Sequence, residues 1–243
     1  MLPAGAAGEE AALIDQINSV VARINAKTAE LQNGIDGKLK WLPGPLQDRV
    51  VSGWNEFVGF LKECWNALAE IVTNLGSPST LWATADAWSD RVGRPVSGQV
   101  QVAEAGSLTV DDNWNGAAAD AYRQNLPRQK VALEKMKSTL CDGISTALSD
   151  LANGICIFLG ALVVALLALV GGIVGALLSS ATIFGLPAAP FIAAGAALVA
   201  VGAFLSAGLH LRSTAATVNS ALRQRLADDS GYLGGHWPPA TTG

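Results

Sequence analysis

The longest uncharged stretch of the sequence runs from Leu151 to Leu211 and reads LANGICIFLGALVVALLALVGGIVGALLSSATIFGLPAAPFIAAGAALVAVGAFLSAGLHL. As helices at about 1.5 Å per residue, Gly154 to Ser180 would be about 40 Å long and Phe191 to Leu211 about 30 Å. Both lengths can cross the hydrocarbon core of a bilayer, which is about 30 Å thick. The Gly- and Pro-containing segment from Gly185 to Pro190 interrupts them. We therefore predict a hydrophobic, transmembrane-like helical hairpin over residues 153–211.

A fully buried helical pair in a large soluble bundle is the alternative interpretation of this stretch. Soluble core helices usually retain a polar edge, whereas here the strongly polar side chains are few. They are Asn153, Ser179, Ser180, Thr182, Ser206 and His210. Small residues at spacings of four favour close packing of helices in lipid, although a stretch so rich in Ala and Gly also produces them by chance. As candidates for this packing we single out Gly171, Gly175, Ser179, Gly202 and Ser206.

The composition is rich in hydrophobic residues and poor in charged ones. Hydrophobic residues make up 50% of the sequence and charged residues 15%, against about 25% charged in typical soluble domains. A net charge of -4 argues against a nucleic-acid binder, whose surface would be basic. Basic residues flank the uncharged stretch at both open ends, so both flanks of a resident protein would stay on one side of the membrane. These residues are Arg128, Lys130, Lys135, Lys137, Arg212, Arg223 and Arg225.

Residues 1–76 contain two amphipathic helical patterns separated by Pro43-Gly44-Pro45. Proline removes a backbone donor and disfavours helix before it, so the first helix should end near Lys40. The apolar positions recur at steps of three and four, as one helix face requires. In the first helix they are Leu13, Ile17, Val20, Ile24, Thr28, Leu31 and Ile35, and in the second Val50, Trp54, Phe57, Leu61, Trp65, Leu68, Ile71 and Leu75.

Residues 77–152 predict a second amphipathic hairpin. Its first helix should begin near Ser79, with a break or kink near Pro95, and its second helix should continue to Leu151. Asp111, Asp112 and Asn113 are candidate N-terminal caps of the second helix. The apolar positions expected to face inward in the first helix are Leu81, Ala85, Trp88, Val92, Val100 and Val102. A short helix and a Gly- and Pro-rich tail over 212–243 complete an all-α chain, a long-helix bundle of two amphipathic hairpins followed by the hydrophobic one.

The turn of this second hairpin, WNGAAADAYR from Trp114 to Arg123, resembles the turn of WXG100 proteins, the helical-hairpin substrates of type VII (ESX) secretion systems. The resemblance covers about residues 77–150 and includes Ser77-Pro78, Leu81, Ala85 and Trp88 on the incoming helix. An amphipathic hairpin followed by a Gly- and Ala-rich apolar region is also similar to mycobacterial Esp-type secretion-associated proteins. The resemblance implies partners: a WXG100-type helical protein or the secretion machinery.

Within this resemblance, the candidate residues for recognition by a partner or the secretion machinery are Trp114, Gly116, Tyr122, Trp82 and Asp86. A packing corner is an equally good interpretation, because Gly116 permits a sharp turn and an indole fills the space between diverging helices. The family's export signal, Tyr-x-x-x-Asp/Glu, is absent after Tyr122 and Tyr232, and only Trp82 with Asp86 has this spacing with an aromatic start. This departure favours export with a partner that carries the signal.

No arrangement of residues in the sequence predicts an enzyme, a metal site or a cofactor. His210 and His236 have no other metal-ligating residues at a suitable spacing in the sequence, and no HExxH, GxSxG or CxxC motif occurs. We expect a type VII secretion-associated protein whose hairpin inserts into or permeabilises a lipid membrane, as a homo-oligomer and secreted or at the cell surface. The alternative is a resident inner-membrane scaffold or assembly factor that binds a WXG100-type partner. A less favoured alternative is the delivery half of a toxin.

Overall fold

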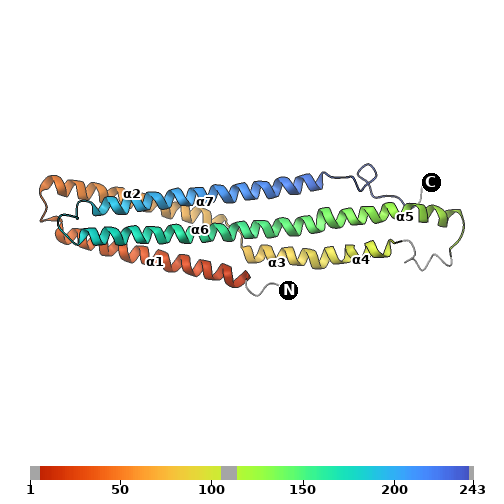
Figure 1. Ribbon diagram of the computed structural model, residues 1–243, viewed down its shortest axis with the longest axis horizontal. Helices are drawn as coiled ribbons and strands as arrows, with labels where there is room; N and C mark the ends of the chain where they lie inside the picture. The colour runs from red at the N-terminus through yellow and green to blue at the C-terminus, as the bar shows by residue number, and fades with distance from the viewer. Residues whose placement is uncertain (1–5, 105–113, 241–243) are drawn as a thin grey trace. The chain divides into compact units, whose positions relative to one another are not determined.

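The computed structural model describes residues 6–104 and 114–240 as an all-α protein with two compact units (Figure 1). The apolar unit consists of residues 6–77 and 154–213, and the WxG unit of the other described residues. Among the described residues, the β-type pairing is a single bridge between Leu233 and His236. The predicted fold class is thus confirmed: two amphipathic helical hairpins precede a hydrophobic one.

The apolar unit contains α1 (Ala6–Leu39), α2 (Gly44–Asn74), the part of α6 (Asp142–Ser180) from Gly154 onward, and the part of α7 (Ala189–Leu226) up to Ser213. The predicted stripe of α1 faces inward, since five of its seven members are buried, and three members of the α2 stripe are buried as well. These are Ile17, Val20, Ile24, Leu31, Ile35, Val50, Phe57 and Leu61. The N-terminal amphipathic hairpin and the hydrophobic hairpin are therefore not separate parts, because the first packs on the second.

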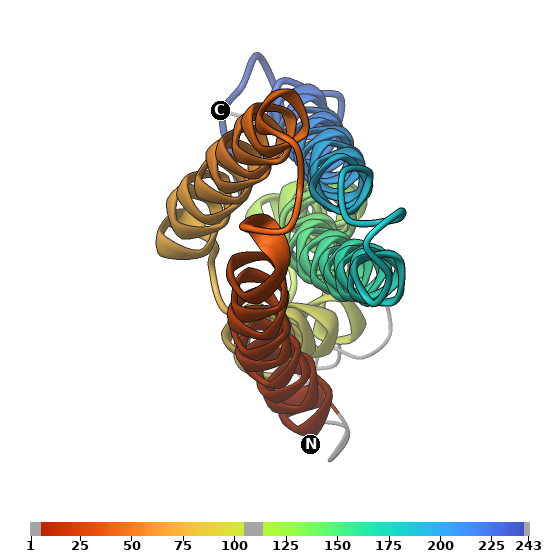
Figure 2. The same cartoon turned by 90° about the vertical axis from the view of Figure 1, so that its left-hand side faces the viewer.

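The contacts within the apolar unit fix the direction of its helices. Lys38 at the end of α1 donates hydrogen bonds to the carbonyl oxygens of Ser180 and Ala181 at the end of α6, at 2.6 and 3.0 Å. Near the start of α2, a Cβ on Gly53 would lie 3.0 Å from the ring of Phe191 near the start of α7. Consequently α1 runs parallel to α6 and α2 parallel to α7, and both turns lie at the same end, which faces the viewer in Figure 2.

The WxG unit pairs an incoming with an outgoing helix. The incoming side consists of α3 (Pro78–Trp88), the π-helical turn η1 (Ser89–Gly93) and α4 (Arg94–Val102). The outgoing side consists of α5 (Ala117–Met136), the π-helical turn η2 (Lys137–Cys141) and α6 up to Asn153, followed in the unit by the end of α7. The hydroxyl of Ser145 donates to the carbonyl oxygen of Ala85 at 3.1 Å, and that of Ser89 lies 3.0 Å from Ser145 Oγ.

Several predicted boundaries differ from the structure. The incoming helix continues through Pro95, and the irregularity predicted near this residue is the π-helical turn η1 just before α4, in whose first turn Pro95 lies. Helix α6 continues through the predicted boundary at residue 152, and α7 continues past Leu211 to Leu226. Val102 was expected to face inward but is exposed.

The start of α5 also differs from the prediction. The predicted caps Asp111, Asp112 and Asn113 lie outside the described residues, and the residue at the N-cap position is Gly116, with φ 112°. A positive φ is readily adopted only by glycine, so a side chain at this position would strain the turn.

Candidate functional site

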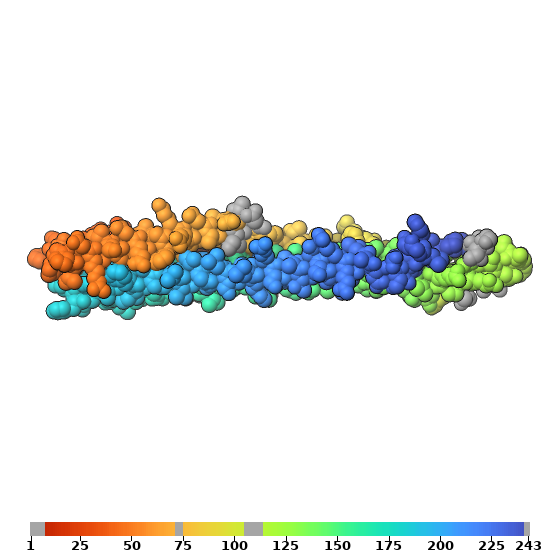
Figure 3. Space-filling model, turned by 90° about the horizontal axis from the view of Figure 1, so that it is seen from above, coloured from red at the N-terminus to blue at the C-terminus, as the bar shows by residue number. Residues whose placement is uncertain are grey.

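The face of the hydrophobic hairpin that α1 and α2 leave open carries large apolar side chains; we call it the uncovered face. On α6 its members recur at steps of three, four and seven, which places them on one side of the helix. They are Ile157, Val164, Leu167, Val174 and Leu178 on α6, and Leu198, Val199, Leu205 and Leu209 on α7. Figure 3 shows α7, in blue, lying open at the surface next to α2, in orange. No charged residue interrupts this face.

The extent of burial bears on the two interpretations of the hairpin. The most apolar 18-residue stretch of α6 is 50% buried, and that of α7 is 28% buried. The two helices are therefore not fully buried within this chain. Within the described residues, α6 and α7 are the two helices long and apolar enough to cross a membrane. From Ile157 to Leu178 the uncovered face is about 32 Å long at about 1.5 Å per residue, close to the thickness of a hydrocarbon core.

The opposite face of the hairpin forms the core of the apolar unit. Its fully buried members include Phe158, Leu162, Leu166, Leu169 and Ile173 on α6, and Ala193, Ala197 and Phe204 on α7. Small side chains on α7 let α2 approach closely, with Cys64 Sγ 3.6 Å from the carbonyl oxygen of Ala197. Burial raises the pKa of the Cys64 thiol to about 11, so this cysteine is a neutral packing group.

The small residues singled out in the sequence have different surroundings in the structure. Gly175 faces α7, because a Cβ there would lie 3.8 Å from Ile192, whereas Gly171 and Gly202 have open space beside them. Ser206 is exposed, and the Ser179 hydroxyl donates to the carbonyl oxygen of Gly185 at 2.9 Å. Among the glycines of α6, Gly172 lies closest to α7, and an added Cβ there would overlap the methyl group of Ala196.

We predict opposite effects for alanine at two adjacent glycines. Gly171→Ala should raise the free energy of unfolding by about 0.5–1 kcal/mol, because alanine is the better helix former and open space surrounds the site. Gly172→Ala should lower the free energy of unfolding by about 1–3 kcal/mol, because its methyl group overlaps Ala196 and the helices must separate. Urea unfolding followed by circular dichroism measures both changes. A stabilised Gly172→Ala variant would contradict the observed contact between α6 and α7.

The WxG turn brings together three of the predicted recognition residues. The rings of Trp114 and Tyr122 are 5.7 Å apart at 49°, and Gly116 lies between them in sequence at the N-cap position. The guanidinium of Arg123 donates to the carbonyl oxygen of Trp114 at 2.9 Å and pairs with Asp120 at 3.2 Å. Sequence reasoning quoted Arg123 but gave it no role, although its position three residues after Asp120 was the available signal.

Trp82 and Asp86 are not part of this cluster. Both lie on α3, which is held against α6 by the hydrogen bond from Ser145 to Ala85. Tyr122 and Ser145 belong to one continuous helix from Ala117 to Ser180. Their separation in sequence corresponds to about 35 Å at about 1.5 Å per residue. The WxG turn and the Trp82–Asp86 pair are therefore two separate surfaces of the WxG unit.

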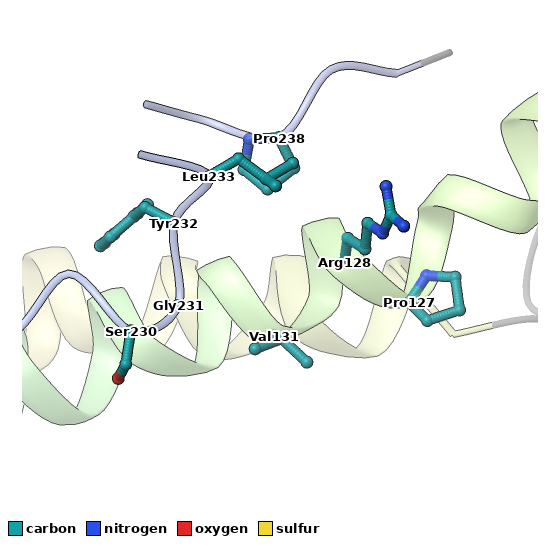
Figure 4. A pocket seen from close by; sticks show the side chains of 8 residues that line it. All are labelled: Pro127, Arg128, Val131, Ser230, Gly231, Tyr232, Leu233 and Pro238. Carbon is teal, nitrogen blue, oxygen red and sulfur yellow. The ribbon is translucent and has the colours of Figure 1, made fainter. Parts of the chain in front are cut away.

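The C-terminal tail continues beyond α7 along α5, and the two line an open cavity of about 320 Å³ (Figure 4). Asp228 pairs with Lys135 of α5, and Gly231 lies directly over the Lys135 side chain. The cavity is lined by Pro127, Arg128, Val131, Ser230, Gly231, Tyr232, Leu233 and Pro238. Its lining carries one charged side chain, Arg128, and two hydroxyl groups, those of Ser230 and Tyr232, and includes no His, Cys, Asp or Glu.

The ion pair of the tail gives a pH-dependent prediction. The hydrogen bond from Lys135, and then those from Ser230, lower the pKa of the Asp228 carboxyl to about 2. A depressed pKa means that the contact favours the folded tail above pH ~4, the usual range of a free Asp, and is lost as the pH falls toward 2. By NMR, the Ser230 amide, which donates to Asp228, should titrate near pH 2 in the wild type and at a clearly higher pH in Lys135→Met, where only the hydrogen bonds from Ser230 still lower the pKa of Asp228. A midpoint near 4 in both proteins would contradict this pairing.

Within residues 6–104 and 114–240, no group of three or more His, Cys, Asp or Glu side chains could hold a metal ion. The fold and the uncovered face define an all-helical protein with a hydrophobic hairpin partly covered by an amphipathic one. Comparison of the chain with protein-family models, curated proteins and solved structures found no match.

Proposed function

We propose that this protein acts on lipid membranes: its hydrophobic hairpin inserts into or permeabilises a bilayer, as a homo-oligomer, in association with type VII secretion. The observation that carries the proposal is the uncovered face, an uncharged surface of large apolar side chains on two helices of membrane-spanning length. Soluble monomers rarely expose contiguous apolar patches larger than a few hundred Å², and larger ones mark interaction sites.

The energetics favour lipid over water as the surroundings of this face. Burial of a large aliphatic side chain stabilises by about 1.5–3 kcal/mol. Nine large side chains on the uncovered face are at least 36% exposed, so covering them is worth on the order of 10 kcal/mol. Small residues on the same face, such as Gly171 and Gly202, would let copies of the hairpin approach one another in a bilayer.

The WxG unit supports the association with secretion. Its turn combines a partly exposed Trp114 indole, the tight turn at Gly116 and the ring of Tyr122 on one small surface. An aromatic anchor at a rigid turn is suited to binding a helical partner. In this proposal, the WxG unit binds a WXG100-type protein or the secretion machinery, and the apolar unit acts on the membrane.

Two measurements on the purified full-length protein test the membrane activity. In flotation, the protein should rise with phospholipid vesicles through a sucrose gradient, and at higher protein-to-lipid ratios it should release an entrapped dye. A protein that stays at the bottom of the gradient and releases no dye between pH 5 and pH 8 would overturn the proposal. Lipid binding without leakage would favour insertion over permeabilisation.

The alternative function, a resident inner-membrane scaffold, is favoured by the basic residues at both ends of the hydrophobic hairpin. By the positive-inside tendency, they would keep both flanks in the cytoplasm. Fractionation of native cells into medium, cytosol and membrane separates the two functions. Protein found wholly in the inner membrane would support the scaffold and exclude the secreted effector.

A further inference from the structure

The end of the apolar unit at which both turns lie exposes large apolar side chains from both of them; we call residues 40–46 and 181–188 the tip. The side chain of Phe184 is 97% exposed, that of Trp41 68% and that of Ile183 51%. These residues come from two different turns, which the hydrogen bonds from Lys38 to Ser180 and Ala181 hold at one end. Aromatic side chains in such a position are typical of membrane–water interfaces.

The turn between α6 and α7 satisfies much of its own backbone, which matters for a segment that leaves water. Six backbone N–H groups between Ala181 and Ala189 donate hydrogen bonds within the turn, one of them to the Thr182 hydroxyl. Lys38 covers two of the carbonyl groups at the end of α6, where the helix dipole favours a cation. Since each unpaired backbone group is expensive in lipid, this turn approaches a bilayer at a reduced cost.

The charge around the tip is weakly basic although the chain as a whole is acidic. Residues 36–49 contain three basic side chains, Lys38, Lys40 and Arg49, and two carboxylates, Asp36 and Asp48, so the local sum is 3 − 2 = +1 against -4 for the chain. The Lys40 ammonium lies 5.4 Å from the Trp41 ring, and the Arg49 guanidinium lies over Phe191 at 5.5 Å. Basic residues next to exposed aromatic ones match the headgroup region of an anionic membrane.

We propose that the tip makes the first contact with the membrane and that its partner is the surface of an anionic phospholipid bilayer. Phe184, Ile183 and Trp41 enter the headgroup boundary, and the neighbouring basic side chains stay with the lipid phosphates. The uncovered face begins close to the tip, at Leu178 on α6, so entry of the tip brings this face next to hydrocarbon. The inference rests on the proposed membrane function and adds the orientation and the lipid class.

Flotation with two vesicle compositions tests the inference in the full-length protein: phosphatidylcholine alone, and phosphatidylcholine with phosphatidylglycerol. The wild type should bind the anionic vesicles more tightly, and Phe184→Asp should weaken that binding at least about tenfold, because a charge replaces the most exposed apolar group. A control in the same unit, Val58→Asp on the exposed side of α2, should bind as the wild type does. Trp41→Ser should weaken the binding several-fold.

The outcomes separate the inference from the function on which it rests. Wild-type protein that binds neither vesicle overturns both. Wild-type binding that Phe184→Asp and Trp41→Ser leave unchanged overturns the role of the tip and leaves the membrane function standing. Equal binding to both vesicle compositions overturns the preference for anionic lipid. Circular dichroism of each variant establishes that its helices are intact, as expected for substitutions at exposed positions.

Discussion

Replacement of Val164 by lysine is expected to lower the partition of the protein into phospholipid vesicles by about 100-fold. Val164 is 67% exposed on the uncovered face of α6, near the middle of the apolar stretch. A lysine at the centre of a membrane-spanning helix costs about 2.5–3.5 kcal/mol on insertion, and about 1.4 kcal/mol corresponds to a factor of ten. In water the same substitution projects into solvent, so the fold should survive. Titration of the protein with vesicles, followed by flotation, measures the partition.

The matched control for this prediction is Ala29→Lys, a lysine on the exposed outer side of α1. It adds the same charge to the same unit but not to the uncovered face, so its partition should stay close to that of the wild type. Thermal unfolding by circular dichroism should give similar midpoints for all three proteins. If Val164→Lys partitions as well as Ala29→Lys, the uncovered face of α6 does not contact hydrocarbon.

The helices of the apolar unit follow from local signals in the sequence. Prolines and glycines mark their ends, and apolar residues at steps of three and four mark the inner faces of α1 and α2. What these faces pack against does not follow, because an amphipathic stripe fits any apolar partner of suitable length. The hydrophobic hairpin is apolar on all sides, so periodicity does not distinguish Leu162, which is buried, from Val164, which is exposed. Only tertiary packing decides between them.

Adjacent glycines also show that the sequence alone does not tell which side of a helix is packed against its neighbour. A spacing of four favours Gly171 with Gly175 as a packing face, yet the glycine of α6 that lies closest to α7 is Gly172. One residue corresponds to about 100° of rotation around a helix, so the choice depends on where the second helix lies. In the WxG unit, the contact between Trp114 and Tyr122 could be predicted, because Trp114 lies just before the start of α5 and Tyr122 lies near the start of that helix. The separation of Trp82 from them depends on the pairing of α3 with α6.

Phe57→Ala is expected to lower the free energy of unfolding of the apolar unit by about 3–5 kcal/mol, the usual cost of deleting a buried phenyl ring. Phe57 lies on α2, its side chain is 0% exposed, and its ring is 5.5 Å from that of Trp54. The nearby substitution Val58→Ala, at a side chain that is 37% exposed, should change the free energy of unfolding much less. Urea unfolding of the full-length variants measures the difference.

This substitution also tests whether α1 and α2 act as a cover for the hydrophobic hairpin. Because α2 packs on α7 at Gly53 and Cys64, weakening of its core should raise the fraction of molecules in which the inner face of the hairpin is open. Phe57→Ala should therefore associate with vesicles faster than the wild type, although no lipid-contacting residue is changed. Stopped-flow mixing with labelled vesicles measures the rate. A destabilised variant that associates no faster would mean that the hairpin meets lipid with its cover still in place.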